Sequence, residues 1–208
     1  MRDVGQTPGE GLKEFFGQYT NHKTMRKIFL FMMVSLDGFF EGPDHELDWH
    51  NVDAEFNEFA AEQLNEVDTL LFGWKTYELM AGYWPTELGK QDSPVIAERM
   101  NSLQKIAFSR KERKVEWHNT RLITENVGGE VTKLKNQPGK NIAIFGSSNL
   151  CVSLIQMGLI DEFRIMVNPV VLGKGHTLFN GIQDKLQLVL LKTRTFNSGN
   201  VLLYYQPT

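Results

Sequence analysis

Three groups of residues in this chain follow short apolar runs and carry the chemical groups that bind anions. The first is Gly146-Ser147-Ser148 with Asn149 and Leu150, in "IAIFGSSNL". A strand that ends at such a turn and leads into a helix presents unpaired backbone N–H groups and the positive end of the helix dipole. This group predicts either a phosphate seat, where Gly146 allows close approach of a ligand, or a plain helix cap made by Ser147 or Ser148. The G-x-G-x-x-G and P-loop patterns are absent, so these residues alone leave both interpretations open.

The second group has the same plan, because the run "LLF" ends at Gly73, and Lys75 and Thr76 then open a helical stretch. A cation and a hydroxyl at a helix start suit a phosphate. The third group is Ser109-Arg110 after "IAF", where the arginine fork can bind two oxygens of a terminal phosphate. Taken singly, each is also explained as an ordinary helix start or an exposed arginine.

Three carboxylates are candidates for a polar contact or a proton transfer. Asp37 follows the first apolar run in "SLDG" and precedes Gly38, so it is either a turn residue or a contact to substrate or cofactor ribose. Asp53 and Glu55 open an amphipathic stretch, where a buried carboxyl with a raised pKa can act as a proton donor. Helix capping and favourable interaction with the helix dipole explain the presence of the same two residues. The spacing does not show which of Asp53 and Glu55 would be the proton donor.

Aromatic residues and histidines complete the set of candidates. Trp49 lies in a predicted loop from which it can close over a substrate, and Trp84 either lines a pocket or packs in the core. The stretch "DHELDWH" contains histidines and carboxylates, but its spacing fits no standard ligand set, so no metal site is predicted. Lys174 and His176, in the Gly-rich "LGKGHTLF", are expected at the surface.

The composition excludes several classes of protein. A chain of 208 residues with 41% hydrophobic residues suits one domain with a sizeable core. The net charge of −3, without a basic run, argues against nucleic acid and anionic membrane as partners. The single cysteine, Cys151, permits no internal disulfide, and no apolar run approaches the roughly 20 residues of a membrane span. Since the N-terminus also lacks the apolar core of a signal peptide, we expect a soluble, cytoplasmic protein.

The elements that must position these residues alternate between strand and helix. Apolar runs predict strands in "KIFLFMMV", "DTLLFG", "QKIAFS", "TRLIT", "NIAIFG" and "DEFRIMVNPVVLG", the last with a bend or an edge at Pro169. Helical spacing predicts helices in "DAEFNEFAAEQLNEV", "WKTYELMAGYW", "VIAERMNSL", "EVTKLKNQPGK" and "SNLCVSLIQMGL". "PTELGKQDSP" is expected to be a loop, and "LQLVLLKTRTF" and "NVLLYYQ", joined by "NSGN", predict a β-hairpin.

This order of elements predicts an α/β, three-layer fold. We expect a mixed, mostly parallel sheet with helices on both faces and a C-terminal antiparallel hairpin, formed by one domain over residues 26–208. Residues 1–25 are expected to be an extension peripheral to it. Since ligands of open α/β sheets sit at the carboxyl ends of the strands, the three anion-binding groups predict one ligand with several phosphates. A dinucleotide such as NADPH, with its pyrophosphate and separate 2′-phosphate, accounts for all three.

Five segments occur in an order that is typical of one superfamily: "MVSLDGFFEG", "DTLLFGWKTYE", "IAFSR", "IFGSSNL" and "NPVVLGKGHTLF". On these segments the chain resembles the dihydrofolate reductase-like superfamily over residues 26–208. It is most similar to the reductase domain of the bifunctional riboflavin-biosynthesis deaminase-reductases, in a stand-alone form. The zinc deaminase half has no counterpart in this sequence, because H-x-E with P-C-x-x-C is absent. The resemblance implies bound NADPH and a homodimer.

The resemblance and the residue arguments together assign three sets of positions. Ser109 and Arg110 are placed at the 2′-phosphate, and Gly146 to Leu150 at the pyrophosphate. The cofactor set is Ser35, Gly73, Lys75, Thr76, Ser109, Arg110, Gly146, Ser147, Ser148, Asn149 and Leu150. The catalytic pair is Asp37 and Asp53, and the substrate pocket takes Gly38, Trp49, Glu55, Trp84 and Phe145.

Two positions depart from the family pattern. The family often has Gly-Arg-x-Thr where this chain has Gly73-Trp74-Lys75-Thr76, and Lys75 can supply the missing charge. Riboflavin reductases often carry a substrate-binding Glu at the position of Phe145, so the riboflavin-pathway substrate is not carried over.

The resemblance implies an NADPH-dependent reductase that passes a hydride to a C=N or C=O bond of a small pterin- or pyrimidine-like substrate. Such an enzyme would be similar to 5-amino-6-(5-phosphoribosylamino)uracil reductase or to dihydrofolate reductase. Two alternatives stay open at this stage. One is a non-catalytic nucleotide- or pterin-binding sensor, and the other is a partner-binding protein whose cofactor cleft has diverged.

Overall fold

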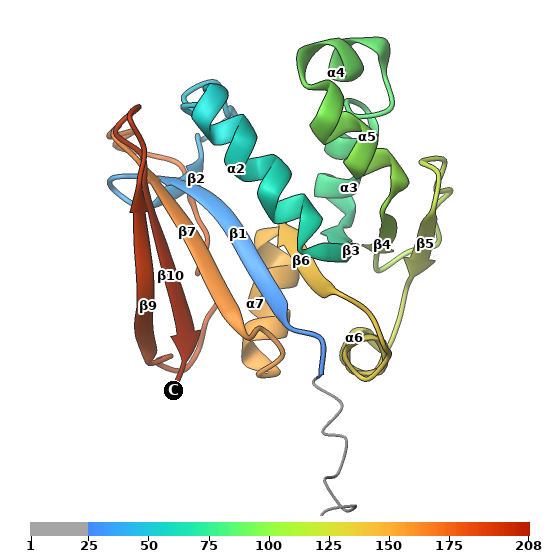
Figure 1. Ribbon diagram of the computed structural model, residues 1–208. Helices are drawn as coiled ribbons and strands as arrows, with labels where there is room; N and C mark the ends of the chain where they lie inside the picture. The colour runs from blue at the N-terminus through green and yellow to red at the C-terminus, as the bar shows by residue number, and fades with distance from the viewer. Residues whose placement is uncertain (1–24) are drawn as a thin grey trace, which may run out of the picture.

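An eight-stranded sheet runs through the computed structural model, which describes residues 25–208 (Figure 1). Its strand order is β5-β4-β3-β6-β1-β7-β10-β9, and a separate ladder pairs β2 with β8. The bounds are β1 Ile28–Ser35, β2 Phe39–Glu41, β3 Val67–Gly73, β4 Gln104–Phe108, β5 Thr120–Ile123, β6 Asn141–Phe145, β7 Glu162–Asn168, β8 His176–Thr177, β9 Leu188–Thr195 and β10 Val201–Pro207.

The pairing directions confirm the predicted mixed sheet. Every neighbouring pair from β5 to β7 is parallel, whereas β10 is antiparallel to both β7 and β9. The parallel strands carry nearly continuous apolar runs because they are covered on both faces. The antiparallel pair is the C-terminal hairpin that the turn residues "NSGN" predict.

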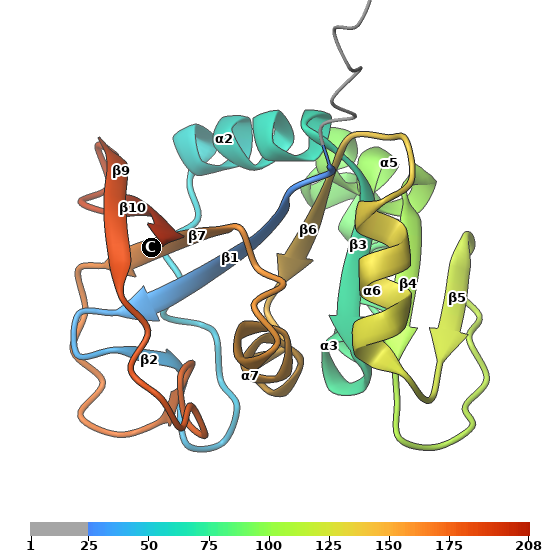
Figure 2. The same ribbon diagram turned by 90° about the horizontal axis from the view of Figure 1, so that it is seen from below.

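Helices form the outer two layers (Figures 1 and 2). Side chains of β1 alternate between the two faces, so Ile28 and Leu30 pack with α6 and α7, while Phe29 packs with α2, α3 and α5. The three-layer α/β prediction is therefore confirmed. The helix bounds are α2 Ala54–Asn65, α3 Trp74–Ala81, α4 Glu87–Asp92, α5 Pro94–Ser102, α6 Val127–Lys135 and α7 Ser148–Gln156.

The structure corrects the expected loop in "PTELGKQDSP", because this segment contains helix α4. Thr86 caps the helix by accepting a hydrogen bond from the Gly89 N–H at 3.2 Å. A six-residue helix flanked by Pro85 and Pro94 is too short to show a periodic apolar pattern, and Pro94 already opens the next helix.

Other boundaries also differ from expectation. Helix α6 begins at Val127 rather than at Glu130, and β7 ends at Asn168, directly before Pro169, which cannot donate a ladder hydrogen bond. The β2–β8 ladder was not predicted. The expected N-terminal extension, residues 1–25, lies almost wholly outside the described residues.

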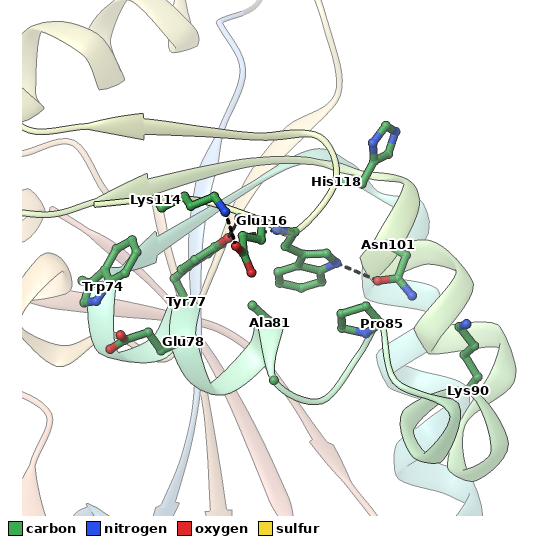
Figure 3. A pocket seen from close by; sticks show the side chains of 12 residues that line it. Trp74, Tyr77, Glu78, Ala81, Pro85, Lys90, Asn101, Lys114, Glu116 and His118 are labelled. Atoms are coloured by element: carbon green, nitrogen blue, oxygen red, sulfur yellow. Dashed lines mark hydrogen bonds and ion pairs between the residues drawn. The ribbon is translucent and has the colours of Figure 1, made fainter. Parts of the chain in front are cut away.

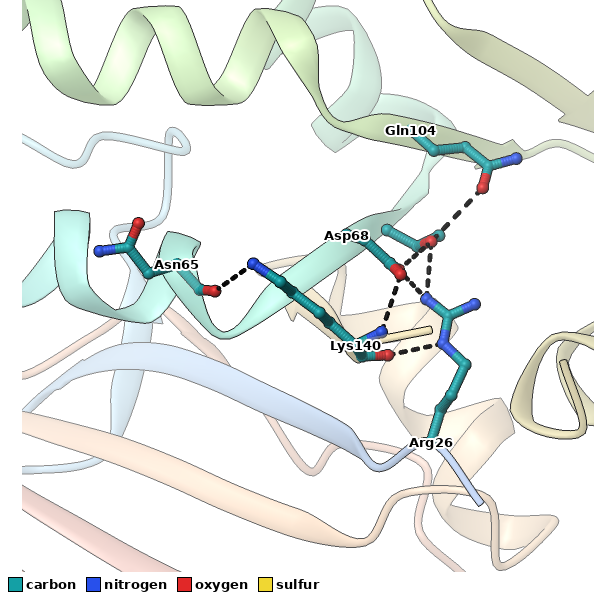
Figure 4. Close-up of polar contacts among 6 residues, drawn as sticks. Arg26, Asn65, Asp68, Gln104 and Lys140 are labelled. Carbon is teal, nitrogen blue, oxygen red and sulfur yellow. Dashed lines mark hydrogen bonds and ion pairs between the residues drawn. The ribbon is translucent and has the colours of Figure 1, made fainter. Parts of the chain in front are cut away.

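Charged side chains at the amino ends of the strands satisfy one another (Figure 4). Arg26, only 5% exposed, forms an ion pair with Asp68 and donates to Thr69 Oγ1 at 2.9 Å and to the Lys140 carbonyl oxygen at 2.6 Å. Asp68 also accepts from the Lys140 N–H at 2.8 Å, and Lys140 Nζ donates to the Asn65 carbonyl oxygen at 3.0 Å. We call these five residues the amino-edge network, and it ties the start of β1 to the starts of β3 and β6.

Candidate functional site

Strands β3 and β6 lie side by side and parallel, but the helices that follow them go to opposite faces of the sheet. Helix α3 packs with α2 and α5 through Tyr77, whereas α7 packs on the other face through Leu150 and Leu154. Such a topological switch point leaves a crevice outside the carboxyl ends of the two strands, where open α/β sheets bind their ligands.

The first two anion-binding groups meet at this crevice. The Gly73 N–H donates to Ser147 Oγ at 2.8 Å, which joins the end of β3 to the turn after β6. Gly146 has a φ of +74°, and a Cβ there would lie 3.4 Å from Thr76 Cγ2, so only glycine adopts this backbone freely. We call Gly73, Thr76, Gly146 and Ser147 the strand-end crevice.

The helix-cap interpretation of the serines is wrong for α7. Ser147 has a left-handed backbone (φ 73°, ψ 61°), its hydroxyl faces Gly73, and no described side chain caps either α7 or α3. The first-turn N–H groups of Ser148, Asn149 and Leu150 therefore have no side-chain acceptor. A left-handed residue followed by a helix start makes a concave row of N–H groups that suits an anion.

The basic side chains predicted for this edge are exposed. Lys75 and Arg110 take part in no ion pair or side-chain hydrogen bond within residues 25–208. Ser109 follows the end of β4, and its hydroxyl accepts a hydrogen bond from the Lys111 N–H at 3.2 Å. Since β4 is parallel to β3, Ser109 and Arg110 leave the sheet at the same edge as Gly73.

The structure adds a basic residue that the sequence argument missed. The Arg113 guanidinium lies over the ring of Trp74, 5.5 Å from the ring centroid, and Trp74 is the first residue of α3. A positive charge therefore stands beside the position where related proteins often carry an arginine. The available signal was the charged segment "RKERK", residues 110–114, together with the aromatic side chain of Trp74.

Ser35 and Asp37 form a clamp at the carboxyl end of β1. The Ser35 hydroxyl donates to Asp37 Oδ1 at 2.6 Å, and the carboxylate accepts from the N–H groups of Leu172 and Gly173 at 3.1 and 2.7 Å. The Ser35 hydroxyl, followed by these backbone N–H groups, holds the pKa of Asp37 below its ordinary value. The ionised carboxylate therefore holds the loop after β7 next to Gly38. That Asp37 also contacts the substrate or the cofactor stays a prediction.

The two acidic residues at the start of α2 have structural contacts. Asp53 is the N-cap and accepts from the Phe56 N–H at 2.8 Å, which confirms the capping interpretation. Glu55 accepts from the Asn197 N–H at 2.8 Å and so joins α2 to the β9–β10 turn. Whether Asp53 also acts on a substrate stays a prediction.

An aromatic row extends from the crevice toward α2. Phe145, at the end of β6, is in register with Phe31 of β1, and their rings meet edge to face at 6.2 Å. Phe31 in turn contacts Phe56 and Phe59 of α2 at centroid distances of 6.4 and 5.8 Å. This row offers an apolar wall on the α2 side of the sheet.

The two tryptophans predicted for the substrate pocket are not brought together. Trp49 donates to the Glu46 carbonyl oxygen at 3.3 Å and packs against the His50 ring at 4.4 Å. Trp84 lies beyond the C-terminal end of α3, where its Nε1 donates to Met80 Sδ at 3.1 Å. Because the whole of α3 separates Trp84 from Gly73, its surroundings match the core-packing alternative.

Burial affects His50 itself, in the segment that follows β2. Loss of solvent lowers the pKa of His50 to about 4, and its Nε2 has no hydrogen-bond partner in the part of the chain that the structure describes. The adjacent Asn51 is held by Asn168 and Asn200, whose contacts with it are 3.0 and 2.9 Å long. These asparagines, which sequence reasoning did not single out, fasten the segment to the end of β7.

A surface cavity of about 810 Å³ lies on the outer side of α3 (Figure 3). Trp74, Tyr77, Glu78 and Ala81 of α3 line it, and at 3.6 residues per turn these share one face of the helix. Thr76, which faces Gly146, projects from the opposite face. From its second residue onward the helix therefore separates this cavity from the strand-end crevice, whereas Trp74, which the Arg113 guanidinium overlies, directly follows Gly73 at the strand end.

Comparison with known proteins decides the family. The family model described as the RibD C-terminal domain matches residues 26–202. The chain belongs to the RibD C-terminal domain family. The uncharacterized protein YyaP of Bacillus subtilis (strain 168) is 37% identical over 188 residues, covering 89% of this chain and 97% of YyaP.

Two solved structures of similar proteins confirm the fold. A putative riboflavin biosynthesis protein from Shewanella sp. PV-4 superposes with a TM-score of 0.67 at 20% identity, covering 88% of this chain and 99% of that one. The diaminohydroxyphosphoribosylaminopyrimidine deaminase/5-amino-6-(5-phosphoribosylamino)uracil reductase of Thermotoga maritima gives 0.67 at 16% identity, covering 94% of this chain and 60% of that one. The predicted dihydrofolate reductase-like, riboflavin reductase-like fold is thus confirmed. None of the described helices is long and apolar enough to cross a bilayer.

Proposed function

We propose that this RibD C-terminal domain protein is an NADPH-dependent reductase of a small, planar heterocycle of the pterin or pyrimidine type. The observation that carries the proposal is the hydrogen bond from the Gly73 N–H to Ser147 Oγ. It brings two uncapped helix N-termini from opposite faces of the sheet to one crevice. Family membership supports the same activity, because reductases of this family use NADPH.

The residues of the crevice fit the phosphates of such a cofactor. The N–H groups of Ser148, Asn149 and Leu150 would hold the pyrophosphate, and Gly146 leaves the approach free of a side chain. Arg110 and Arg113 would bind the 2′-phosphate, with Ser109 and Lys75 beside them. When bound, the cofactor supplies a hydride, and the chain supplies anchoring and orientation.

The aromatic row would form the substrate side of the site. Phe31, Phe56 and Phe145 offer ring edges and faces against which a planar heterocycle can pack. Phe145 has no charge at the position where related riboflavin reductases often carry a Glu. We therefore expect a substrate whose recognition relies on stacking and on a polar contact with Asp53 or Glu55.

The test is nucleotide binding by the wild type and two arginine variants. Arg110→Ala should weaken NADPH binding about tenfold and leave NADH binding unchanged, because only NADPH carries the 2′-phosphate. Arg121→Ala is the matched control, since it removes an exposed arginine of β5 that is paired with Glu130. Equal losses for both nucleotides, or no NADPH binding at millimolar concentration, would contradict the proposal.

A non-catalytic, nucleotide- or pterin-binding sensor is the second candidate. Two observations favour it, namely Trp74 where the family often has an arginine and Phe145 where it often has a Glu. The distinguishing measurement is NADPH consumption in the presence of a panel of oxidised pterins and pyrimidines. Tight NADPH binding without consumption of NADPH across the panel would favour the sensor.

We also propose that two copies associate through β9. This strand is the last of the sheet, and Val189, Leu190 and Leu191 are 45–50% exposed on it. Exposed apolar edge strands are prone to pair with another chain. Light scattering should give twice the chain mass for the wild type and the monomer mass for Leu190→Lys, whereas a monomeric wild type contradicts this proposal.

A further inference from the structure

The β2–β8 ladder places two metal-ligating side chains opposite each other. Glu41 of β2 and His176 of β8 are cross-strand partners, and His176 Nδ1 lies 3.2 Å from Glu41 Oε1. The close approach depends on Gly175, because a side chain there would overlap the Glu41 carbonyl oxygen. Cross-strand pairing thus holds a carboxylate oxygen and an imidazole nitrogen within one coordination sphere.

A third ligating group comes from the turn after β2. His45 Nδ1 lies 2.7 Å from the same Glu41 Oε1, and the His45 and His176 rings stack at 4.9 Å with an interplanar angle of 11°. His45 reaches this position with a φ of +65°, a left-handed conformation that costs a side-chain-bearing residue free energy. One ligand atom from each of the three residues lies within 4.8 Å of the others.

The spacing of these atoms matches a small divalent ion. Two ligands that each stand about 2.0–2.1 Å from a tetrahedral Zn²⁺ are separated by about 3.3 Å. The distance of 3.2 Å between His176 Nδ1 and Glu41 Oε1 matches this separation. The distance of 2.7 Å between His45 Nδ1 and the same oxygen is a hydrogen bond, which an ion between the two atoms would lengthen by about 0.6 Å. Two imidazoles and one carboxylate favour Zn²⁺ and similar first-row ions over Mg²⁺ and Ca²⁺, which select oxygen ligands.

The surroundings also favour a cation. Asp44, Glu46 and Asp48 flank His45 in the sequence and are exposed, so they add negative potential to the chain around it. The side chains of His45 and His176 are 56% and 46% exposed, whereas that of Glu41 is 19% exposed. A bound ion would therefore have three protein ligands and an open side toward water.

We propose that Glu41, His45 and His176 form a binding site for a divalent first-row transition ion of the Zn²⁺ type. The prediction that the chain holds no metal considered only the stretch "DHELDWH", and two of these three ligands lie outside it. The ion would link the turn after β2 to the loop that Asp37 fastens through Gly173. It would thereby tie together the two segments that leave the sheet beside the end of β1 (Figure 2).

The experiment measures metal binding to the metal-free, full-length chain by calorimetry and by thermal unfolding. Zn²⁺ should bind with one ion per chain and raise the midpoint of unfolding, whereas Mg²⁺ and Ca²⁺ should do neither. Co²⁺ should give a visible d–d absorption band on binding. His45→Gly and His176→Ala should each weaken Zn²⁺ binding at least tenfold and abolish the Co²⁺ band.

The variants are chosen so that misfolding does not imitate loss of the site. His45→Gly suits the left-handed backbone, so the metal-free variant should be at least as stable as the wild type. His118→Ala is the matched control, because His118 is an exposed histidine remote from the cluster on the chain segment before β5. Unchanged Zn²⁺ binding in the two cluster variants, equal loss in His118→Ala, or no binding by the wild type at micromolar concentration would overturn the proposal.

Discussion

The two edges of the central sheet treat their charges in opposite ways. At the amino edge, Arg26, Asp68 and Lys140 satisfy one another and nearby carbonyl oxygens (Figure 4). At the carboxyl edge, Lys75 and Arg110 have no described partner, and the N-termini of α3 and α7 carry no side-chain cap. The first edge is complete in the unliganded chain, whereas the second leaves its donors available to an anion.

Buried polar atoms show the same difference. Within residues 25–208, five such side-chain atoms lack a hydrogen-bond partner, and four of them belong to His50, Trp74, Ser198 and Asn200 at or near the carboxyl edge. A buried polar group without a hydrogen-bond partner lowers the stability of the fold, so a concentration of such groups indicates a region with a role other than stability. The two ends of the same strands therefore differ, because polar groups are satisfied at the amino end and are left without partners at the carboxyl end.

The largest effect is expected when the amino-edge network is broken. Asp68→Ala leaves the buried Arg26 guanidinium without its carboxylate and should lower the free energy of unfolding by about 3 kcal/mol. Glu87→Ala, which breaks the exposed pair with Lys90, should change it by no more than about 0.5 kcal/mol. Chemical denaturation measures both values. If Asp68→Ala also weakens NADPH binding by folded protein, the proposed division between the two edges is wrong.

The next effect concerns His50, a buried titratable group in the segment that follows β2. Its pKa is about 4 in the folded chain against an ordinary 6.5, so the unfolded chain takes up a proton first as the pH falls. Stability present above pH 6.5 is lost as the pH falls toward 4, by about 2 kcal/mol between pH 7 and pH 5. His50→Gln should remove this part of the acid sensitivity in denaturation curves recorded at both pH values. Identical pH dependence in the two proteins would show that His50 titrates normally.

Gly146→Ala tests the crevice with a built-in control. The left-handed backbone should cost an alanine about 1 kcal/mol of stability, and the methyl group should weaken NADPH binding about tenfold. Gly158→Ala carries the same backbone penalty, since its φ is +66° and no atom lies within 4 Å of the added carbon. It should therefore lower stability equally and leave nucleotide binding intact. Equal binding losses in both variants would assign the effect to stability alone.

The smallest effect is expected at Arg113. Its guanidinium is exposed and rests on Trp74, so Arg113→Ala should change the free energy of unfolding by less than about 0.5 kcal/mol. NADPH binding should nevertheless weaken about fivefold, with NADH binding unchanged. Fluorescence titration of both nucleotides checks this. A variant that binds NADPH as the wild type does would remove Arg113 from the carboxyl-edge site.

The fold could be predicted because its elements are locally encoded. "KIFLFMMV" and "DTLLFG" are apolar enough to require cover on both faces, and "NSGN" marks the final turn. The helix α4 and the ladder of β2 with β8 escaped prediction for physical reasons. The first is too short for periodicity, and the second consists of two short segments more than 130 residues apart that only the folded chain aligns.

For the candidate site, the positions of the glycines at the strand ends could be predicted from the sequence, but the contacts between side chains could not. Gly73 and Gly146 each follow an apolar run, so their place at the strand ends could be inferred from spacing alone. That Ser147 faces Gly73 rather than capping α7 depends on the pairing of β3 with β6, which no local pattern reports. The same applies to Glu41 and His176, whose meeting depends on a distant register.

Cys151 lies directly beneath the turn at Gly146, and its thiol donates to the Gly146 carbonyl oxygen at 3.4 Å. Burial raises the pKa of this thiol, so it stays protonated and shielded from reagents while the turn is closed. Because the chain has no other cysteine, its rate of alkylation reports on one local event, the opening of the turn. Cys151 is thus a natural reporter of that motion, and a nucleotide that binds at the turn should lower its rate of alkylation.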